Sequence, residues 1–526
     1  MSATSNPRVS IALLAAQLAQ TIKGRNDLIC GSLIASATAV SGQLYTDVGK
    51  KTNSELDSLF GANTDLRNKI KQFIASNGGY SQLNVKALSE DGAGTTATGK
   101  IAIGSDGSGA ATEDGELIVS LVDEFQWQET ITVVTGDTDA VIAGKIVTAF
   151  TGNATLPLTI AINGTNACEA DLTSVDKCTI ANFYGIKVEG NVAGLSSSVV
   201  TAMSGGTNNP DVSTFFDNLQ STRFTGINWP TAWISDLNVL KTYLDSRFNA
   251  ANAILDGVGF VGNQDTFANV KSVVDAQNSQ SILFGGYQKT AAGGYPSVVH
   301  PADWALCYFQ GVRARRLTND APIATFVTST SGTLDAFGGP ALASLPYFNT
   351  PMLNMNVSDP NDLYTNQEQV ELEESGFSVI GVNSAENQMI TGPMVTTYTT
   401  DAAGNPNDSF HYLNYVDTAS VCREYFFNNL KSRFSQSRLT NGTLVPGRSM
   451  ENENSIRAEF NKLYKQLSDL SLTIRGAEAE KFFRANLVVT PDLAQRKVTV
   501  SMQLPIVTQL GNIIVSSQLN FNFQEV

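Results

Sequence analysis

Three glycines with the spacing of a dinucleotide-binding loop are the first candidates for chemistry. Gly257, Gly259 and Gly262 form a G-x-G-x-x-G pattern between an apolar run and a helical pattern. In a dinucleotide site such glycines let backbone N–H groups approach the pyrophosphate, and an acidic residue ends the next strand. The next strand here, "SILFGG", ends without Asp or Glu. Glycines at an ordinary strand-to-helix turn explain the spacing as well, so an enzyme that binds NAD here is a distant alternative.

The two histidines of the chain limit its nucleophilic chemistry. His300 precedes a proline at a predicted helix start, and His411 lies beside Tyr412 in a strand-like run. A Ser-His-Asp or Cys-His arrangement would have to use one of these two imidazoles. The sequence also has no P-loop and no G-x-S-x-G nucleophile elbow. We interpret His300 as a helix-entry residue and His411 as a partly buried imidazole, and we expect no catalytic residue and no cofactor.

The five cysteines show no C-x-x-C spacing, which together with two histidines argues against a zinc site. Cys168 and Cys178 lie ten residues apart in an acidic segment. They could bridge a hairpin after release from a reducing cytoplasm. The simpler interpretation is two free, partly buried thiols.

Bulk composition indicates a multidomain globular protein. At 526 residues, with 42% hydrophobic and 16% charged residues, the chain is long enough for three or four domains. No apolar run reaches the ~18 residues that a membrane helix needs. The N-terminal run "VSIALLAAQLAQTI" has neither the basic leader nor the cleavage site of a signal peptide. We therefore expect a soluble protein made in the cytoplasm, without membrane insertion.

Charge is distributed unevenly along the chain. The net charge of −15 argues against a general nucleic-acid binder, which needs a basic face. Residues 89–200 hold 4 Lys+Arg against 15 Asp+Glu, a net of −11. Residues 411–526 hold 13 Lys+Arg against 10 Asp+Glu, a net of +3. The two parts are therefore expected to face different surroundings.

The elements that must position these residues follow from hydrophobic periodicity. The first ~90 residues predict an α/β unit with one long helix over 54–79. Short alternating runs over 96–199 predict a β-rich inserted domain, a small sandwich with one helix at 139–152. Strand–helix alternation returns after residue 200 with a predicted helix at 211–221, and two amphipathic helices at 417–434 and 455–470 precede the closing strands.

The last strand is among the clearest in the sequence. Apolar side chains alternate with polar ones along it, at Ile513, Val515, Leu519, Phe521 and Phe523. Period-two alternation predicts a strand with one buried face. Chain ends usually fray, so such a strand needs a sheet to complete. One interpretation is that it pairs with residues 498–504 in its own sheet.

Several segments, in their order, carry a resemblance to a known family. They are "LFGANTDLRNKIKQF", "GGTNNPDVSTFFDNLQSTRFTGINWP", "NQEQVELEESGFSVIGVN" and the pair "SVCREYFFNNLKSRF … ENSIRAEFNKLYKQL". This collinear set resembles the contractile tail sheath proteins of Mu-like myophages, over residues ~25 to 526. Two departures stand out. "FTGINWP" ends in Trp-Pro where relatives usually show Pro-Tyr, and the segment before residue 25 matches poorly.

The resemblance implies an α+β and α/β multidomain fold. Its parts would be an N-terminal arm, 1–24, an α/β sheath core, 25–95 and 200–360, a β-rich inserted outer domain, 96–199, and an α+β C-terminal inner domain, 361–526, with a strand arm, 511–526. It also implies a structural subunit rather than an enzyme. Such subunits polymerise as stacked hexameric rings around a tail tube and contract to drive the tube through the host envelope. The implied partners are other copies of the chain, the tail tube protein, and baseplate and tail terminator proteins, in a virion tail assembled in the host cytoplasm.

The resemblance gives the terminal strand and the basic region specific roles. The strand 513–523 would complete a sheet shared between subunits, with Gly511 as the hinge of the arm. Arg457, Lys462 and Lys465, on the polar side of the helix 455–470, would face the tube through weak ion pairs. An ordinary solvated helix face explains these cations equally well. The alternatives for the whole chain are a contractile bacteriocin-type sheath and another self-assembling shell, such as a surface-layer protein.

Overall fold

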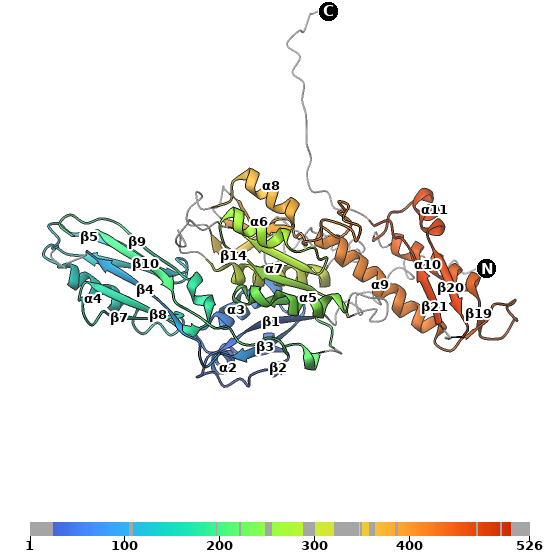
Figure 1. The fold of residues 1–526 in the computed structure, drawn as a ribbon, viewed down its shortest axis with the longest axis horizontal. Coiled ribbons are helices and arrows are strands. Elements are labelled where there is room, and N and C mark those ends of the chain that lie inside the picture. Colours follow the sequence, from blue (N-terminus) through green and yellow to red (C-terminus); the bar gives the residue numbers. More distant parts are fainter. Residues whose placement is uncertain are drawn as a thin grey trace, which may run out of the picture. The chain divides into compact units, whose positions relative to one another are not determined.

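The computed structural model describes residues 25–104, 109–195, 197–219, 222–247, 255–287, 300–319, 347, 350–356, 363–383, 388–469, 472–494 and 497–506. The chain divides into two compact units, Met1–Asn428 and Asn429–Val526, here called unit 1 and unit 2 (Figure 1). Each unit is described by itself. The structure is mixed α/β with several separate sheets. No helix in the described part is long and apolar enough to cross a membrane.

A seven-stranded sheet organises unit 1. Its strand order is β15-β13-β12-β11-β1-β3-β2, and every neighbouring pair is parallel except β2 with β3. The strands are β1 (Asn26–Leu33), β2 (Leu44–Tyr45), β3 (Gln82–Ser89), β11 (Gly226–Trp229), β12 (Val258–Gly262), β13 (Ile282–Gly286) and β15 (Phe377–Val379). This sheet and the helices packed on it are called the body below.

The body sheet is covered on both faces, which explains its continuous apolar strands. In β1, Leu28 and Cys30 belong to one core cluster, whereas Ile29 between them belongs to another. Side chains of α5 (Leu237–Asp245) and α6 (Phe267–Asp275) contribute to the first cluster. Those of α3 (Asp65–Asn77) and α7 (Ala302–Asn319) pack in the clusters of the opposite face. Strand–helix alternation after residue 200 is thus confirmed.

The predicted single helix over 54–79 is two helices. The first, α2 (Asn53–Phe60), ends at Gly61, whose φ of 84° lies in a region that favours glycine. The second, α3, begins after Thr64, whose side chain accepts a hydrogen bond from the backbone N–H of Arg67. The apolar periodicity was correct on both sides of the break. The stop signal at Gly61 and the N-cap at Thr64 were both present in the sequence.

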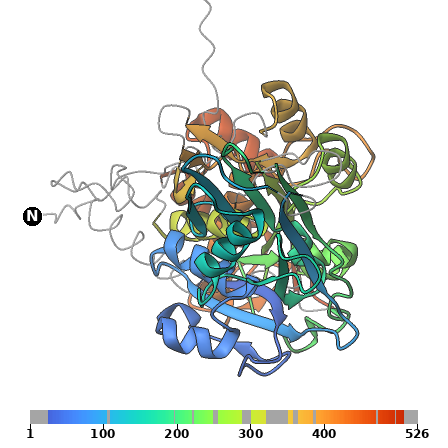
Figure 2. The same ribbon diagram turned by 90° about the vertical axis from the view of Figure 1, so that its left-hand side faces the viewer.

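Strands β4 to β10 lie between β3 and β11 in the sequence and form two further sheets, called the insert below. The sheets are β10-β4-β8-β7 and β6-β5-β9, and their inner side chains share one core cluster with helix α4 (Asp139–Phe150). Figure 2 shows this helix against the insert strands. The strands are β4 (Thr96–Ile103), β5 (Gly115–Val122), β6 (Gln128–Val133), β7 (Leu158–Ile162), β8 (Glu169–Lys177), β9 (Gly185–Glu189) and β10 (Ser198–Ser204).

The helix predicted over 211–221 is absent, and within its described part the structure has turns and the short 3-10 helix η3 (Asp217–Leu219). Phe215 and Phe216 explain the difference. Phe215 contacts Trp229 and Trp233 edge-on, and Phe216 stacks on Tyr243 with ring centroids 3.9 Å apart. Packing of adjacent aromatic rings into the core therefore overrides the helical pattern.

The remainder of unit 1 follows the body sheet. Helix α8 (Asn366–Ser375) leads into β15, so residues beyond 361 still extend the body sheet. Strands β14 (Pro351–Asn356), β16 (Gly381–Asn383) and β17 (Gln388–Ile390) form a separate sheet. The other short 3-10 helices are η1 (Val48–Lys50), η2 (Thr179–Phe183) and η4 (Thr231–Asp236). Helix α9 (Leu413–Phe434) contains the division between the units.

Unit 2 holds helices and two small two-stranded sheets. Its elements after α9 are β18 (Arg438–Leu439), β19 (Met450–Glu451), α10 (Glu453–Asp469), α11 (Ala477–Ala485), β20 (Val488–Asp492) and β21 (Lys497–Ser501). The sequence predicted α10 and strand structure over residues 485–505, where β20 and β21 lie, but not α11. The predicted terminal strand 513–523 and the hinge Gly511 lie outside the described residues, as does the predicted N-terminal arm.

Candidate interaction surface and buried polar sites

An apolar groove in the described part of unit 2 is a candidate interaction surface. Its cavity volume is about 310 Å³, and its lining includes Phe434 of α9, Ile456 and Phe460 of α10, and Val498 and Val500 of β21. Among the described strands, β21 pairs with β20 alone. The other edge of β21 is therefore open in the described part, and an open strand edge beside an apolar groove is suited to accept a further strand.

The three cations proposed from the sequence lie on α10 and have acidic partners within the chain. Arg457 Nη2 lies 2.7 Å from a Glu453 carboxylate oxygen, and Nη1 donates to the backbone of Leu487. Lys462 Nζ lies 2.8 Å from Glu459, and Lys465 Nζ lies 3.7 Å from Glu480. The lysine side chains are 60% and 56% exposed. Because exposed pairs contribute only ~0–1 kcal/mol each, these lysines could exchange partners.

The G-x-G-x-x-G glycines occupy positions of close packing. Gly259 and Gly262 lie inside β12, not in a turn that opens a helix. A Cβ on Gly257 would lie 2.0 Å from the backbone oxygen of Phe224, and one on Gly262 would lie 2.6 Å from the backbone nitrogen of Asp303. Backbone atoms of Phe224 and Asp303 thus occupy the space that a pyrophosphate would need. These glycines permit strand and helix contacts, which argues against the dinucleotide interpretation.

Each histidine has a specific partner. His300 is fully buried, and its Nδ1 lies 2.7 Å from a carboxylate oxygen of Asp123, in the turn between β5 and β6. The ring of Phe125 stacks on the imidazole with centroids 5.7 Å apart. Burial alone would raise the pKa of Asp123, but His300 and hydrogen bonds hold it below its ordinary value. The Asp123–His300 pair therefore joins the insert to the start of α7, a contact that the sequence did not predict.

The second histidine is a satisfied, largely buried side chain, close to its interpretation from the sequence. His411 Nδ1 lies 3.2 Å from the backbone oxygen of Tyr398. Burial lowers the pKa of its imidazole. A neutral imidazole with a backbone partner fits a structural role.

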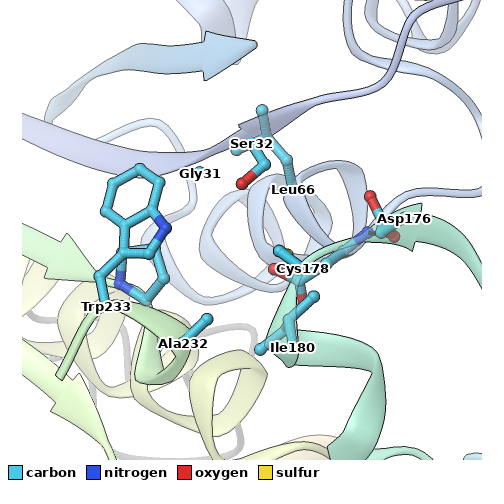
Figure 3. Close-up of a pocket in the computed structure, with 10 residues that line it drawn as sticks. Gly31, Ser32, Leu66, Asp176, Cys178, Ile180, Ala232 and Trp233 are labelled. Atoms are coloured by element: carbon cyan, nitrogen blue, oxygen red, sulfur yellow. Dashed lines mark hydrogen bonds between the residues drawn. The ribbon is translucent and has the colours of Figure 1, made fainter. Parts of the chain in front are cut away.

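A cluster of buried charges occupies the other contact between insert and body. It consists of Asp65 and Lys69 of α3, Asp303 of α7 and Asp176 of β8, all less than a tenth exposed. Asp176 and Trp233 lie on opposite sides of a small cavity of about 10 Å³ beside this cluster (Figure 3). A cavity of this volume holds one water molecule at most, so it is too small for an organic substrate.

The proposed disulfide is not present. Cys168 precedes β8 and Cys178 follows it, and both thiols are free and buried. A nine-residue strand spans about 30 Å, whereas bridged cysteines have Cα atoms less than ~7 Å apart. The hairpin that would have brought them together does not exist, because the segment is one continuous strand. Burial also raises the pKa of the Cys178 thiol to about 12, which disfavours its reactive form.

Among the described residues, no group of three or more His, Cys, Asp or Glu side chains could hold a metal ion. The buried-charge cluster was missed at the sequence level because its members come from segments more than a hundred residues apart. The one local signal is that Asp65 and Asp303 each lie in the first turn of a helix.

Comparison with known proteins gives one match in sequence. No family model matches the chain. A Mu-like prophage FluMu tail sheath protein of Haemophilus influenzae is 26% identical over 455 residues, covering 84% of this chain and 82% of the relative. Among solved structures, a sheath tail protein of Desulfitobacterium hafniense aligns with a TM-score of 0.45 at 12% identity, over 92% of this chain and 94% of its own. A sheath tail protein of Listeria innocua aligns with a TM-score of 0.47 at 12% identity, over 95% of this chain and 96% of its own.

The sequence match extends over most of both chains, as the collinear segments predicted. The chain is similar to a tail sheath protein of a Mu-like prophage, and its resemblance to the Mu-like tail sheath proteins is confirmed.

Proposed function

We propose that this chain is the structural subunit of a contractile phage tail sheath. It would polymerise as stacked hexameric rings around a tail tube and contract to drive the tube through the host envelope. The similarity to a Mu-like prophage tail sheath protein over 84% of the chain carries this proposal. The packing of the G-x-G-x-x-G glycines and the small volume of the buried polar cavity are consistent with a structural role.

Negative-stain microscopy of the purified full-length chain tests the proposal. Hollow tubes built from hexameric rings are expected. Flat lattices would favour another kind of shell protein, and a monodisperse monomer at high concentration would contradict self-assembly. Tubes of this kind would be formed by the sheath of a genome-carrying phage and by that of a contractile bacteriocin alike.

The terminal segment of a second copy is the proposed occupant of the apolar groove in unit 2. The groove offers apolar side chains and an open edge of β21. The segment 513–523 carries an apolar side chain at nearly every second position, which suits a strand with one buried face. Main-chain hydrogen bonds would link the subunits, while the chain around Gly511 would leave the link free to turn. This sharing rests on the proposed sheath function.

Deleting residues 513–526 is expected to leave a soluble subunit that no longer forms tubes. Point variants in β21 sharpen the test, because Val500 lines the groove whereas Thr499 is exposed on the other face. Val500→Asp should prevent tube formation, and the matched control Thr499→Asp should not. Circular dichroism and thermal melting of both variants check that the subunit stays folded. Normal tubes from the truncated chain would refute the shared strand.

The resemblance to the Mu-like tail sheath proteins implies the domain roles in the lattice, and the charge of each part suits them. We assign the insert, which lies in the acidic segment with a net charge of −11, to the outer surface, where repulsion keeps a large particle soluble. We assign unit 2, which lies in the segment with a net charge of +3, to the tube-facing surface. Lys462 and Lys465 would there exchange their partners within the chain for acidic groups of the tube.

A further inference from the structure

The contact between the insert and the body contains three buried carboxyl groups and one buried amine. The exposed fractions are 6% for Asp65, 1% for Asp176 and Asp303, and 0% for Lys69. Lys69 Nζ lies 3.5 Å from Asp65 and 3.9 Å from Asp303. One ammonium group cannot neutralise three carboxylates, and an uncompensated buried charge is costly. Some member of this cluster must therefore keep its proton when the insert is docked.

The three carboxyl groups are not equivalent. Asp65 and Asp303 lie in the first turns of α3 and α7, where the helix dipole favours an anion. Asp65 also accepts a hydrogen bond from Trp304 Nε1 at 2.8 Å, and Asp303 accepts one from the backbone of Thr231 at 2.8 Å. Asp176 lies near the end of β8, and one of its oxygens accepts the first backbone N–H of α3, that of Asp65, at 3.0 Å. Unlike Asp65 and Asp303, it forms no ion pair with Lys69 among the described residues. Asp176 is therefore the carboxyl group with the least compensation for a negative charge.

The surroundings of Asp176 disfavour its ionised form. Burial raises its pKa well above the ordinary value, and the negative charges of Asp65 and Glu90 raise it further. Lys69 and the hydrogen bond from Asp65 oppose the rise without cancelling it. Burial likewise raises the pKa of Asp303, to about 6, against the effect of Lys69.

Backbone strain marks the same contact. Four non-glycine residues in the described part have positive φ, and two of them lie where the insert meets the body. Val122, with a φ of 61°, precedes Asp123, the partner of His300; Cys178, with a φ of 79°, lies two residues after Asp176. Such conformations are unfavourable for a residue with a Cβ and persist only where the surroundings enforce them. Weakening the contact would relieve this strain.

We propose that the contact between insert and body is a proton-dependent latch, in which the protonated carboxyl of Asp176 lets β8 dock on α3 and α7 and its ionisation loosens the insert. An acid with a higher pKa in the docked state binds its proton more tightly there. Docking is therefore strongest at low pH and weakens as the pH rises through the raised pKa. The latch concerns the single chain and does not depend on assembly into a sheath.

Tryptophan fluorescence of the full-length chain can follow the latch, because all four tryptophans lie at or near it. Trp127 of the insert and Trp304 of α7 pack edge to face with centroids 6.1 Å apart. Trp229 and Trp233 pack at 5.1 Å, and Trp233 lines the cavity that Asp176 also lines (Figure 3). Loosening the insert would expose these rings to water and shift their emission to longer wavelength.

The expected result is a reversible red shift as the pH rises from about 5 to about 9, above the ordinary Asp pKa of about 3.9, without loss of far-UV circular dichroism. Asp176→Asn, which is neutral at every pH, should remove the shift. Glu90→Gln removes a neighbouring negative charge at a half-buried position and should move the midpoint to lower pH. The matched control is Asp139→Asn, a buried aspartate in α4 of the insert that should keep the midpoint of the natural chain.

An emission maximum independent of pH in the natural chain would overturn the latch. An Asp176→Asn protein with an unchanged midpoint would assign the response to another group and would also overturn it. Where Asp176→Asn fails to fold, Glu90→Gln decides alone: a midpoint that stays or rises contradicts the proposal. Tube formation is a separate readout, so loss of the latch would leave the proposed sheath function untouched.

Discussion

At the scale of single residues, the glycines at 257–262 show how one spacing can serve packing instead of binding. Gly262 ends β12 directly against the start of α7, where an added Cβ would lie 2.6 Å from both the backbone nitrogen and a side-chain oxygen of Asp303. Because Asp303 also belongs to the buried-charge cluster, this glycine lets the strand approach the cluster closely. The position requires a residue without a side chain, and it does not require the conformational freedom of glycine.

Gly262→Ala is expected to lower the free energy of unfolding by about 1–3 kcal/mol, because the neighbouring atoms belong to a helix start that cannot move easily. The matched control is Gly144→Ala in α4, where an added Cβ meets nothing within 4 Å. Removing a helix-interior glycine there should stabilise by up to about 1 kcal/mol. Urea denaturation of the three proteins measures both effects.

Adding NAD should leave the urea midpoint of the natural chain unchanged. A saturable increase of that midpoint with NAD concentration would support the dinucleotide site.

The sequence predicted single-residue features that depend on local patterns, but it did not predict contacts between segments that are far apart in the chain. The expectation that the three glycines do not form a dinucleotide site followed from local features, their spacing at a strand-to-helix turn and the missing acidic residue. The contacts of Asp123 with His300 and of Asp176 with Asp65 join segments that lie 177 and 111 residues apart. No local pattern encodes such pairs, since burial of each charge depends on how the insert docks. The cations of α10 were placed on an exposed helix face from periodicity, but their partners within the chain were not predicted.

At the scale of elements, local signals fixed most helices and strands. Helix α8 is an example: Thr365 and Glu368 form a capping box, in which the threonine side chain accepts the N–H of Glu368 and the glutamate accepts the N–H of Thr365. The break at Gly61 had equally local causes. The loss of the helix predicted over 211–221 had a distant cause, the aromatic core around Trp229, and so could not be derived from its own residues.

Thr365→Ala is expected to destabilise α8 by about 1 kcal/mol, because the backbone N–H of Glu368 loses the Thr365 hydroxyl that accepts its hydrogen bond. Since α8 leads into β15 at the edge of the body sheet, hydrogen exchange of the β15 amides should accelerate with it. Thr365→Ser retains the hydroxyl and serves as the control. Equal exchange rates in both variants would show that the cap does not limit the stability of this edge.

At the scale of the whole molecule, the acidic and the mildly basic segments of the sequence correspond to separately packed parts of the chain. The acidic segment 89–200 contains all of the insert except the end of β10, and the mildly basic segment 411–526 contains unit 2. The structure places β15 in the body sheet directly after α8, and the compact C-terminal unit begins at Asn429, so it is shorter than the inner domain 361–526 that the resemblance implied. No local pattern in the sequence reveals that β15 returns to pair with β13. Long-range strand pairing therefore keeps β15 with the body.

Reversing two charges on unit 2 tests whether its basic face meets the tail tube. The double variant Lys462→Glu and Lys465→Glu should still form tubes of its own but should co-sediment less with purified tail tubes, and its residual binding should depend less on salt. Each exposed pair contributes only ~0–1 kcal/mol, yet the loss repeats in every subunit of a polymer. The control is Lys481→Glu in α11, whose side chain is 79% exposed in the same unit. Because Glu459 would then face a new glutamate, thermal melting must show that the double variant is as stable as the control. Equal tube binding by the two proteins would mean that the α10 face is an ordinary solvated surface and that the tube contact lies elsewhere on the chain.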